Sequence, residues 1–166
     1  AEQLHVTLAY LGDAAGIDDA ARAAIIEDVT DIGSQHETLA VDGFALSLFN
    51  PSNDDQDTCI VLGLSGDGLE QTRKVVLDTV NEIAVAIAPF AMPEQHAPWT
   101  PHLTLIYTQD AGMLAELIDR TGPTTHDRLR VAFPGEITDI PLTAAAEEVA
   151  MPWHIVPNSA DCPTDR

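Results

Sequence analysis

Basic side chains are scarce in this chain. Seven Lys and Arg residues stand against 27 Asp and Glu among 166 residues, which gives a formal net charge of −20. Lys and Arg supply most of the phosphate neutralisation in protein–nucleic acid complexes, so this balance argues against binding along a DNA or RNA duplex. A small phosphorylated ligand held at a single site is still allowed, and an acidic surface by itself is typical of a soluble protein.

Cysteines and long apolar runs are scarce as well. The two cysteines, Cys59 and Cys162, have neither the number nor the spacing of a disulfide framework. We therefore expect a reducing compartment, the cytoplasm, or the host cytoplasm if the protein is viral. The longest apolar run, residues 83–92, is too short to cross a bilayer and contains Pro89, so we expect no membrane partner.

The rest of the composition is that of a folded domain. Hydrophobic residues make up 45% of the chain, and a chain of this length can form one domain with a sizeable core or two small lobes that share one. The chain does not begin with Met, and its first motif starts close to the N-terminus. We expect a domain taken from a longer protein.

Hydrophobic periodicity predicts the elements of the first half of the chain. Apolar residues at steps of three and four indicate a helix that Asp18 or Asp19 caps and Gly33 ends, and a second helix that ends at Pro89. Runs of β-forming residues indicate strands. The expected elements are strands at 4–11, 37–49 and 58–65, and helices at 18–32 and from 69 to Pro89.

The second half repeats this order. We expect a strand at 99–108, a short helix that begins at Asp110 and ends at Gly122-Pro123, and strands at 126–133, 136–143 and 146–156. The repeat predicts an α+β fold with two pseudo-symmetric lobes, whose antiparallel sheets face a central cleft and whose helices lie outside. Residues 1–156 would form this domain, and 157–166 a polar tail or linker.

A six-residue motif occurs once in each half. Residues 5–10 read HVTLAY and residues 102–107 read HLTLIY. In a strand, residues i and i+2 share a face, so each motif would present one imidazole and one hydroxyl on the same side. A single His-x-Thr is weak evidence, whereas two copies in a repeated frame favour a shared site formed by His5, Thr7, His102 and Thr104.

This set of side chains is suited to acid–base chemistry on a phosphodiester. Histidine is the side chain whose ordinary pKa allows it to take and give protons near neutrality. One imidazole can deprotonate the attacking group while the other protonates the leaving oxygen. The threonine hydroxyls can donate hydrogen bonds to the non-bridging oxygens as charge develops in the transition state.

A metal site is the competing interpretation of the histidines. His5, His102 and His96 could supply three ligands, but His96 falls in a loop and no carboxylate or cysteine is spaced to complete the set. We therefore expect no metal and no other cofactor.

The motifs carry a family resemblance. Residues 5–12, HVTLAYLG, and residues 101–105, PHLTL, resemble the paired signatures of the two-histidine phosphoesterase superfamily, which includes 2′-5′ RNA ligase-like proteins and cyclic phosphodiesterases. The resemblance implies a bilobal fold and metal-free hydrolysis or transfer at 2′,3′-cyclic or 2′-5′-linked phosphates. It also implies that His5 and His102 form the acid–base pair and that Thr7 and Thr104 hold the phosphate.

Four further residues are candidates for substrate binding: Trp99, Phe49, Trp153 and Arg130. The aromatic side chains could stack on a nucleobase or could pack in the core. Arg130 shares a strand face with Arg128 and could reach a phosphate, although pairing with the acidic surface is the favoured interpretation.

The tyrosines and the other histidines have simpler expected roles. Tyr10 and Tyr107 lie at odd offsets from their motif histidines, so strand alternation predicts that both turn to the opposite face and pack in the core. His36, His126 and His154 have no threonine two residues later and are expected to be solvated.

The preferred function is a phosphodiesterase for a small nucleotide or short oligonucleotide with a 2′,3′-cyclic, 2′-5′ or cyclic-oligonucleotide linkage. The alternative is a catalytically idle nucleotide-binding or structural module. The polar tail after Trp153 is similar to junctions in composite proteins of actinobacterial phages. That similarity implies a module of a larger phage polypeptide, and a phage enzyme of this kind would degrade host cyclic nucleotide signals.

Overall fold

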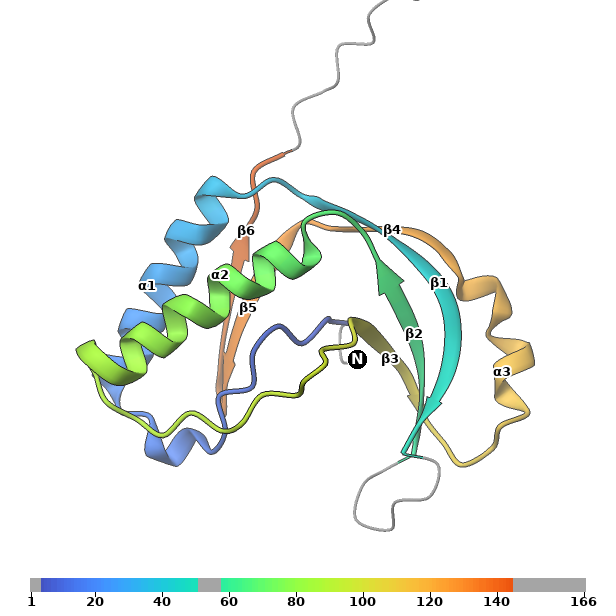
Figure 1. Cartoon of the computed structure of the whole chain (residues 1–166), viewed down its shortest axis with the longest axis horizontal. Coiled ribbons are helices and arrows are strands. Elements are labelled where there is room, and N and C mark those ends of the chain that lie inside the picture. The colour runs from blue at the N-terminus through green and yellow to red at the C-terminus, as the bar shows by residue number, and fades with distance from the viewer. Residues whose placement is uncertain (1–3, 51–57, 145–166) are drawn as a thin grey trace, which may run out of the picture.

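The computed structural model describes residues 4–50 and 58–144 and has the expected α+β class (Figure 1). Its elements alternate along the chain without separating into a helical and a β half. In order they are η1 (Ala14–Gly16), α1 (Asp19–Gln35), β1 (Leu39–Phe49), β2 (Cys59–Ser65), α2 (Leu69–Glu82), the π-helical turn η2 (Ile83–Ile87), β3 (His102–Tyr107), α3 (Met113–Glu116), η3 (Ile118–Arg120), β4 (Gly122–His126), β5 (Arg128–Phe133) and β6 (Glu136–Pro141).

A four-stranded antiparallel sheet with the order β3-β2-β1-β4 forms one side of the molecule. The sheet curls into a half-barrel (Figure 1). One of its two inner strands, β2, is buried over most of its length, as a strand with neighbours on both sides and a continuous apolar sequence should be. Leu62 and Leu103 pack with Val41, Leu64 and Leu69 in an apolar cluster, which we call the sheet cluster.

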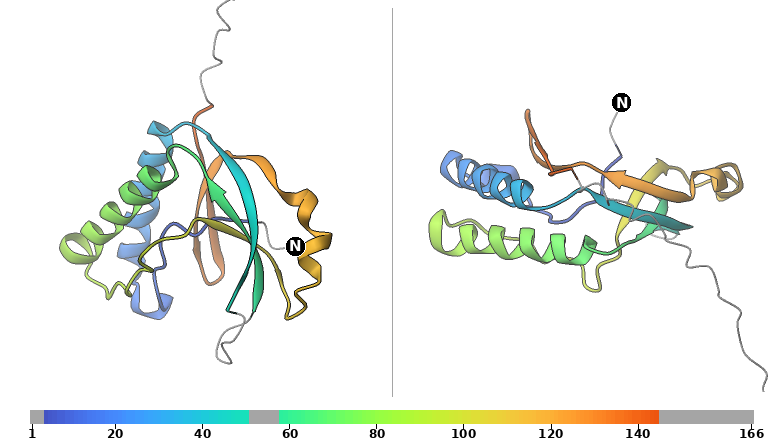
Figure 2. Two further views of the ribbon diagram at one scale, coloured as in Figure 1. Left: turned by 45° about the vertical axis from the view of Figure 1, so that its right-hand side comes forward. Right: turned by 90° about the horizontal axis from the view of Figure 1, so that it is seen from above.

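The second sheet is the β5–β6 hairpin, which packs against α1. Strict alternation along β5 turns Leu129, Val131 and Phe133 inward, where they meet the apolar faces of α1 and α2. The two helices lie side by side over this part of the molecule (Figures 1 and 2). This larger core therefore joins residues from both halves of the chain.

The structure confirms the helices and strands that were predicted from a strong hydrophobic periodicity. Helix α1 begins after Asp18, whose carboxylate accepts a hydrogen bond from the Ala21 amide at 2.8 Å. The strands expected at 37–49 and 58–65, and the helix expected from residue 69, lie within a few residues of β1, β2 and α2. Gly33 does not end its helix, because α1 continues to Gln35.

Two expectations about strands are wrong. Residues 4–13 belong to no strand, because the neighbouring segment is interrupted by Pro93, Pro98 and Pro101, and proline has no N–H to donate to a ladder. The helical turns α3 and η3 stop before Gly122-Pro123 as expected, but the next strand does not wait until residue 126, because these two residues begin β4, which joins the outer edge of β1. The strand expected at 146–156 and the polar tail lie outside the described residues.

Candidate active site

The second His-x-Thr motif lies on β3, an edge strand of the larger sheet. Leu103 is 4% exposed and points into the sheet cluster. His102 and Thr104 flank it, so they share the opposite face of the strand and both are half-buried. This part of the sequence-based arrangement is confirmed, since the motif forms a strand with its imidazole and its hydroxyl on one side.

Two contacts fix the imidazole of His102. Its Nδ1 lies 2.8 Å from the carbonyl oxygen of Thr100, and its ring centroid lies 4.8 Å from that of Phe49 with the planes tilted by 52°. A carbonyl oxygen can only accept, so the neutral ring carries its proton on Nδ1 and leaves Nε2 as the basic nitrogen. Phe49, a candidate for stacking on a substrate, instead contacts a candidate catalytic ring.

The surroundings of His102 include a residue that sequence reasoning missed. Gly63 of β2 is paired with His102, and a Cβ built on Gly63 would lie 3.3 Å from Cζ of Phe44. The Phe44 ring therefore lies over Gly63, the cross-strand partner of His102, and is 61% exposed. The strand register shifts between Gly43 and Ala45, so simple alternation along the sequence could not have assigned Phe44 to this face.

The first motif is held beside the second by contacts outside the sheets. His5 and Thr7 are exposed, whereas Val6 between them packs against the sheet cluster, which includes Leu103. The carbonyl oxygen of Thr7 accepts a hydrogen bond from the indole N–H of Trp99 at 3.2 Å. The N-terminal segment thus runs up to the start of β3 (Figure 1), and the backbones of the two motifs are brought to one part of the molecule.

Trp99 is used for packing. The guanidinium of Arg73 from α2 lies 4.9 Å from the centroid of the indole ring, and the ring packs against the sheet cluster. Its N–H is already bonded to Thr7. One face of the ring and its single polar group are therefore engaged within the protein. Trp153, the other tryptophan candidate, lies outside the described residues.

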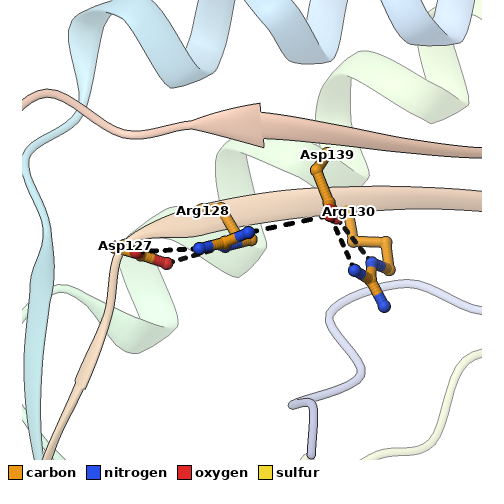
Figure 3. A network of polar contacts seen from close by, with 4 residues as sticks. All are labelled: Asp127, Arg128, Arg130 and Asp139. Atoms are coloured by element: carbon orange, nitrogen blue, oxygen red, sulfur yellow. Dashed lines mark hydrogen bonds and ion pairs between the residues drawn. The ribbon is translucent and has the colours of Figure 1, made fainter. Parts of the chain in front are cut away.

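Arg130 pairs with the acidic surface, which confirms the interpretation that the sequence favoured. Its Nε and a terminal guanidinium nitrogen lie 2.6 and 2.7 Å from the two carboxylate oxygens of Asp139 (Figure 3). Arg128 binds Asp127 in the same two-point manner. The hydrogen bond from Arg130 lowers the pKa of Asp139 and keeps it ionised. Arg130 is therefore a member of a surface ion-pair network.

The expected burial of the tyrosines is wrong. Tyr10 is 60% exposed and Tyr107 is 63% exposed. Tyr10 lies in a segment that is not a strand, so alternation does not apply to it, and Tyr107 lies on an edge strand beyond a shift in register. His126 differs from expectation as well, because it is half-buried and burial lowers its pKa despite the nearby Asp127.

Within residues 4–50 and 58–144, no three His, Cys, Asp or Glu side chains are grouped so that they could hold a metal ion. Among those residues, no helix is long and apolar enough to span a membrane.

An α+β fold with helices and a curled antiparallel sheet is consistent with the fold of the two-histidine phosphoesterases. The match to known families agrees with this class. The sequence model of the 2′-5′ RNA ligase superfamily matches residues 1–144, and the chain belongs to that superfamily. No curated protein matches the chain.

Proposed function

We propose that this protein is a metal-independent phosphodiesterase that uses His5 and His102 as its acid–base pair. Membership of the 2′-5′ RNA ligase superfamily supports chemistry of the phosphoesterase or ligase type. The observation that carries the proposal furthest is the fixed tautomer of His102. With Nδ1 bound to the Thr100 carbonyl, Nε2 is the nitrogen available for proton transfer, and Thr104 shares its strand face.

The reaction needs two proton transfers around one phosphorus atom. One imidazole takes the proton from the attacking water or neighbouring hydroxyl as its oxygen bonds to phosphorus. The other, as imidazolium, gives its proton to the leaving sugar oxygen as the old P–O bond breaks. Thr7 and Thr104 donate hydrogen bonds to the non-bridging oxygens, where negative charge builds up.

The proposed substrates are small. The net charge of −20 would repel a long polyanion, and Arg128 and Arg130 are engaged with aspartates. A 2′,3′-cyclic nucleotide, a 2′-5′-linked dinucleotide or a cyclic oligonucleotide carries few phosphates and fits this limit. For a module of a phage protein, the cyclic oligonucleotide would be a host signal that the enzyme removes.

The test is turnover of a substrate panel in the presence of EDTA. The panel contains 2′,3′-cyclic nucleotides, 2′-5′ and 3′-5′ dinucleotides and cyclic oligonucleotides. We expect activity that survives chelation, a bell-shaped pH profile, and a loss of about 10²- to 10⁴-fold in each of His5→Ala and His102→Ala. His96→Ala removes an exposed histidine outside the motifs and is the matched control.

Each remaining outcome points to a different function. Tight binding of one of these nucleotides without turnover would support the idle binding module. Loss of activity on chelation would favour a metal enzyme. Formation of a 2′-5′ linkage from a cyclic phosphate and a free hydroxyl would place the protein among ligases, because the same proton transfers run in reverse.

A further inference from the structure

The first motif needs a substitute for strand pairing. Residues 4–13 belong to no strand, yet they carry His5 and Thr7. The segment opposite contains several prolines, which cannot donate to a ladder. Something other than a sheet must therefore hold this segment beside β3.

The side chain of Gln95 supplies part of that connection. Its Oε1 accepts from the Tyr10 amide at 2.9 Å, and its Nε2 donates to the Tyr10 carbonyl oxygen at 2.8 Å. An antiparallel hydrogen-bonded residue pair exchanges the same two bonds. Nε2 also donates to the carbonyl oxygen of Pro93 at 3.0 Å, which fixes the amide in this orientation. One side chain thus replaces a rung of a β-ladder.

Trp99 supplies a second connection. It binds the segment at Thr7, which is three residues nearer to His5 than Tyr10 is. Its indole N–H donates to the Thr7 carbonyl oxygen at 3.2 Å, and its ring is held between Arg73 and the sheet cluster. Because Trp99 precedes His102 by three residues, it links the backbone of one motif directly to the strand that carries the other.

The contacts run antiparallel, with a shift of one residue between the pair at Thr7 and the pairs at Tyr10 and Gly12. Thr7 meets Trp99, Tyr10 meets Gln95, and a Cβ built on Gly12 would lie 3.3 Å from Cδ of Pro93. Continuing from the Thr7–Trp99 pair toward the N-terminus sets residue 5 opposite residue 101. The position next to 101 is the second motif histidine, so the bond from Trp99 brings the backbone of the first motif toward the second, and the bonds from Gln95 hold the same segment further along.

We infer that Gln95 and Trp99 are positioning residues that hold the first His-x-Thr motif against the second. This inference rests on the proposed function, because alignment matters only if both histidines act on one phosphate. Trp99 acts here through its N–H and not as a platform for a nucleobase. Displacement of a reacting group by about 1 Å can cost about 10²-fold in rate, so loss of either bond should lower kcat.

Trp99→Phe and Gln95→Ala separate this role from substrate stacking. Phenylalanine keeps an aromatic face but has no N–H, and Gln71→Ala removes an exposed glutamine of α2 as the control. We expect kcat to fall about 10-fold or more in both variants with KM little changed. A raised KM with unchanged kcat in Trp99→Phe would show that the ring binds substrate, which overturns the positioning role of Trp99.

A second measurement does not depend on turnover. Amide hydrogen exchange at Tyr10 should be faster in Gln95→Ala than in the wild type and in Gln71→Ala. The ring signals of His5, assigned with His5→Ala, should shift in both positioning variants. If the wild type turns over no substrate but these signals respond, the proposed function fails and the connection stands. Unchanged kcat, Tyr10 exchange and His5 signals in an active enzyme would overturn the inference.

Discussion

Replacing Gly33 with alanine tests how closely α1 packs on the hairpin. Gly33 is buried in the last turn of α1. A Cβ at this position would lie 2.6 Å from Cγ2 of Ile140 and 3.2 Å from the carbonyl oxygen of Pro141. Ile140 is 3% exposed and belongs to the core between the helices and β5–β6. The methyl group therefore has no space unless the helix or β6 moves.

Two opposing terms set the size of the effect. Alanine in place of glycine inside a helix gains about 1 kcal/mol in helix propensity. Forcing an extra methyl group into a packed core costs about 1–3 kcal/mol, and this contact falls near the upper end because a backbone oxygen also lies close. We expect Gly33→Ala to lower the free energy of unfolding by about 1–2 kcal/mol. For a chain of this size each kcal/mol lowers Tm by roughly 2–4 °C.

Urea unfolding of four proteins measures the contact directly: the wild type, Gly33→Ala, Ile140→Ala and the double variant. If Cγ2 of Ile140 is the obstacle, the double variant should be more stable than the sum of the single effects predicts. Gly16→Ala, whose Cβ would have no neighbour within 4 Å, should change stability by less than about 0.5 kcal/mol. Additive effects, or a Gly33→Ala protein as stable as the wild type, would refute the packing argument.

Three further predictions concern stability. Burial lowers the pKa of His126, so the unfolded chain binds a proton at this side chain more readily than the folded protein does. The urea midpoint should therefore fall as the pH drops below about 6.5, and it should fall less in His126→Gln. The hydrogen bond from Arg130 lowers the pKa of Asp139. The stabilisation from this ionised pair is therefore present above pH about 3.9 and is lost as the pH falls toward the lower pKa of the folded state. Asp139→Asn should lack this part of the loss of stability in acid unfolding. Asp18→Ala removes the N-cap of α1 and should cost about 1 kcal/mol in thermal unfolding, whereas Asp18→Asn should retain most of the stability.

The sequence by itself determined the elements whose pattern is local. The apolar period of Ala21, Ile25 and Val29 specifies the buried face of α1, and the apolar runs specify β1 and β2. The alternation around Leu103 likewise placed His102 and Thr104 on one face of a strand. These inferences succeed because neighbours along the chain fix which side of an element is buried.

Tertiary structure decided the features that depend on distant partners. A strand-forming sequence at residues 4–13 is no strand, because the chain opposite it is rich in proline and Gln95 takes over the hydrogen bonds of Tyr10. The indole N–H of Trp99 donates to the carbonyl oxygen of Thr7, and the guanidinium of Arg130 forms an ion pair with Asp139. Hydrogen bonds and ion pairs are satisfied by whichever group the fold brings within reach, and a linear pattern does not record that distance.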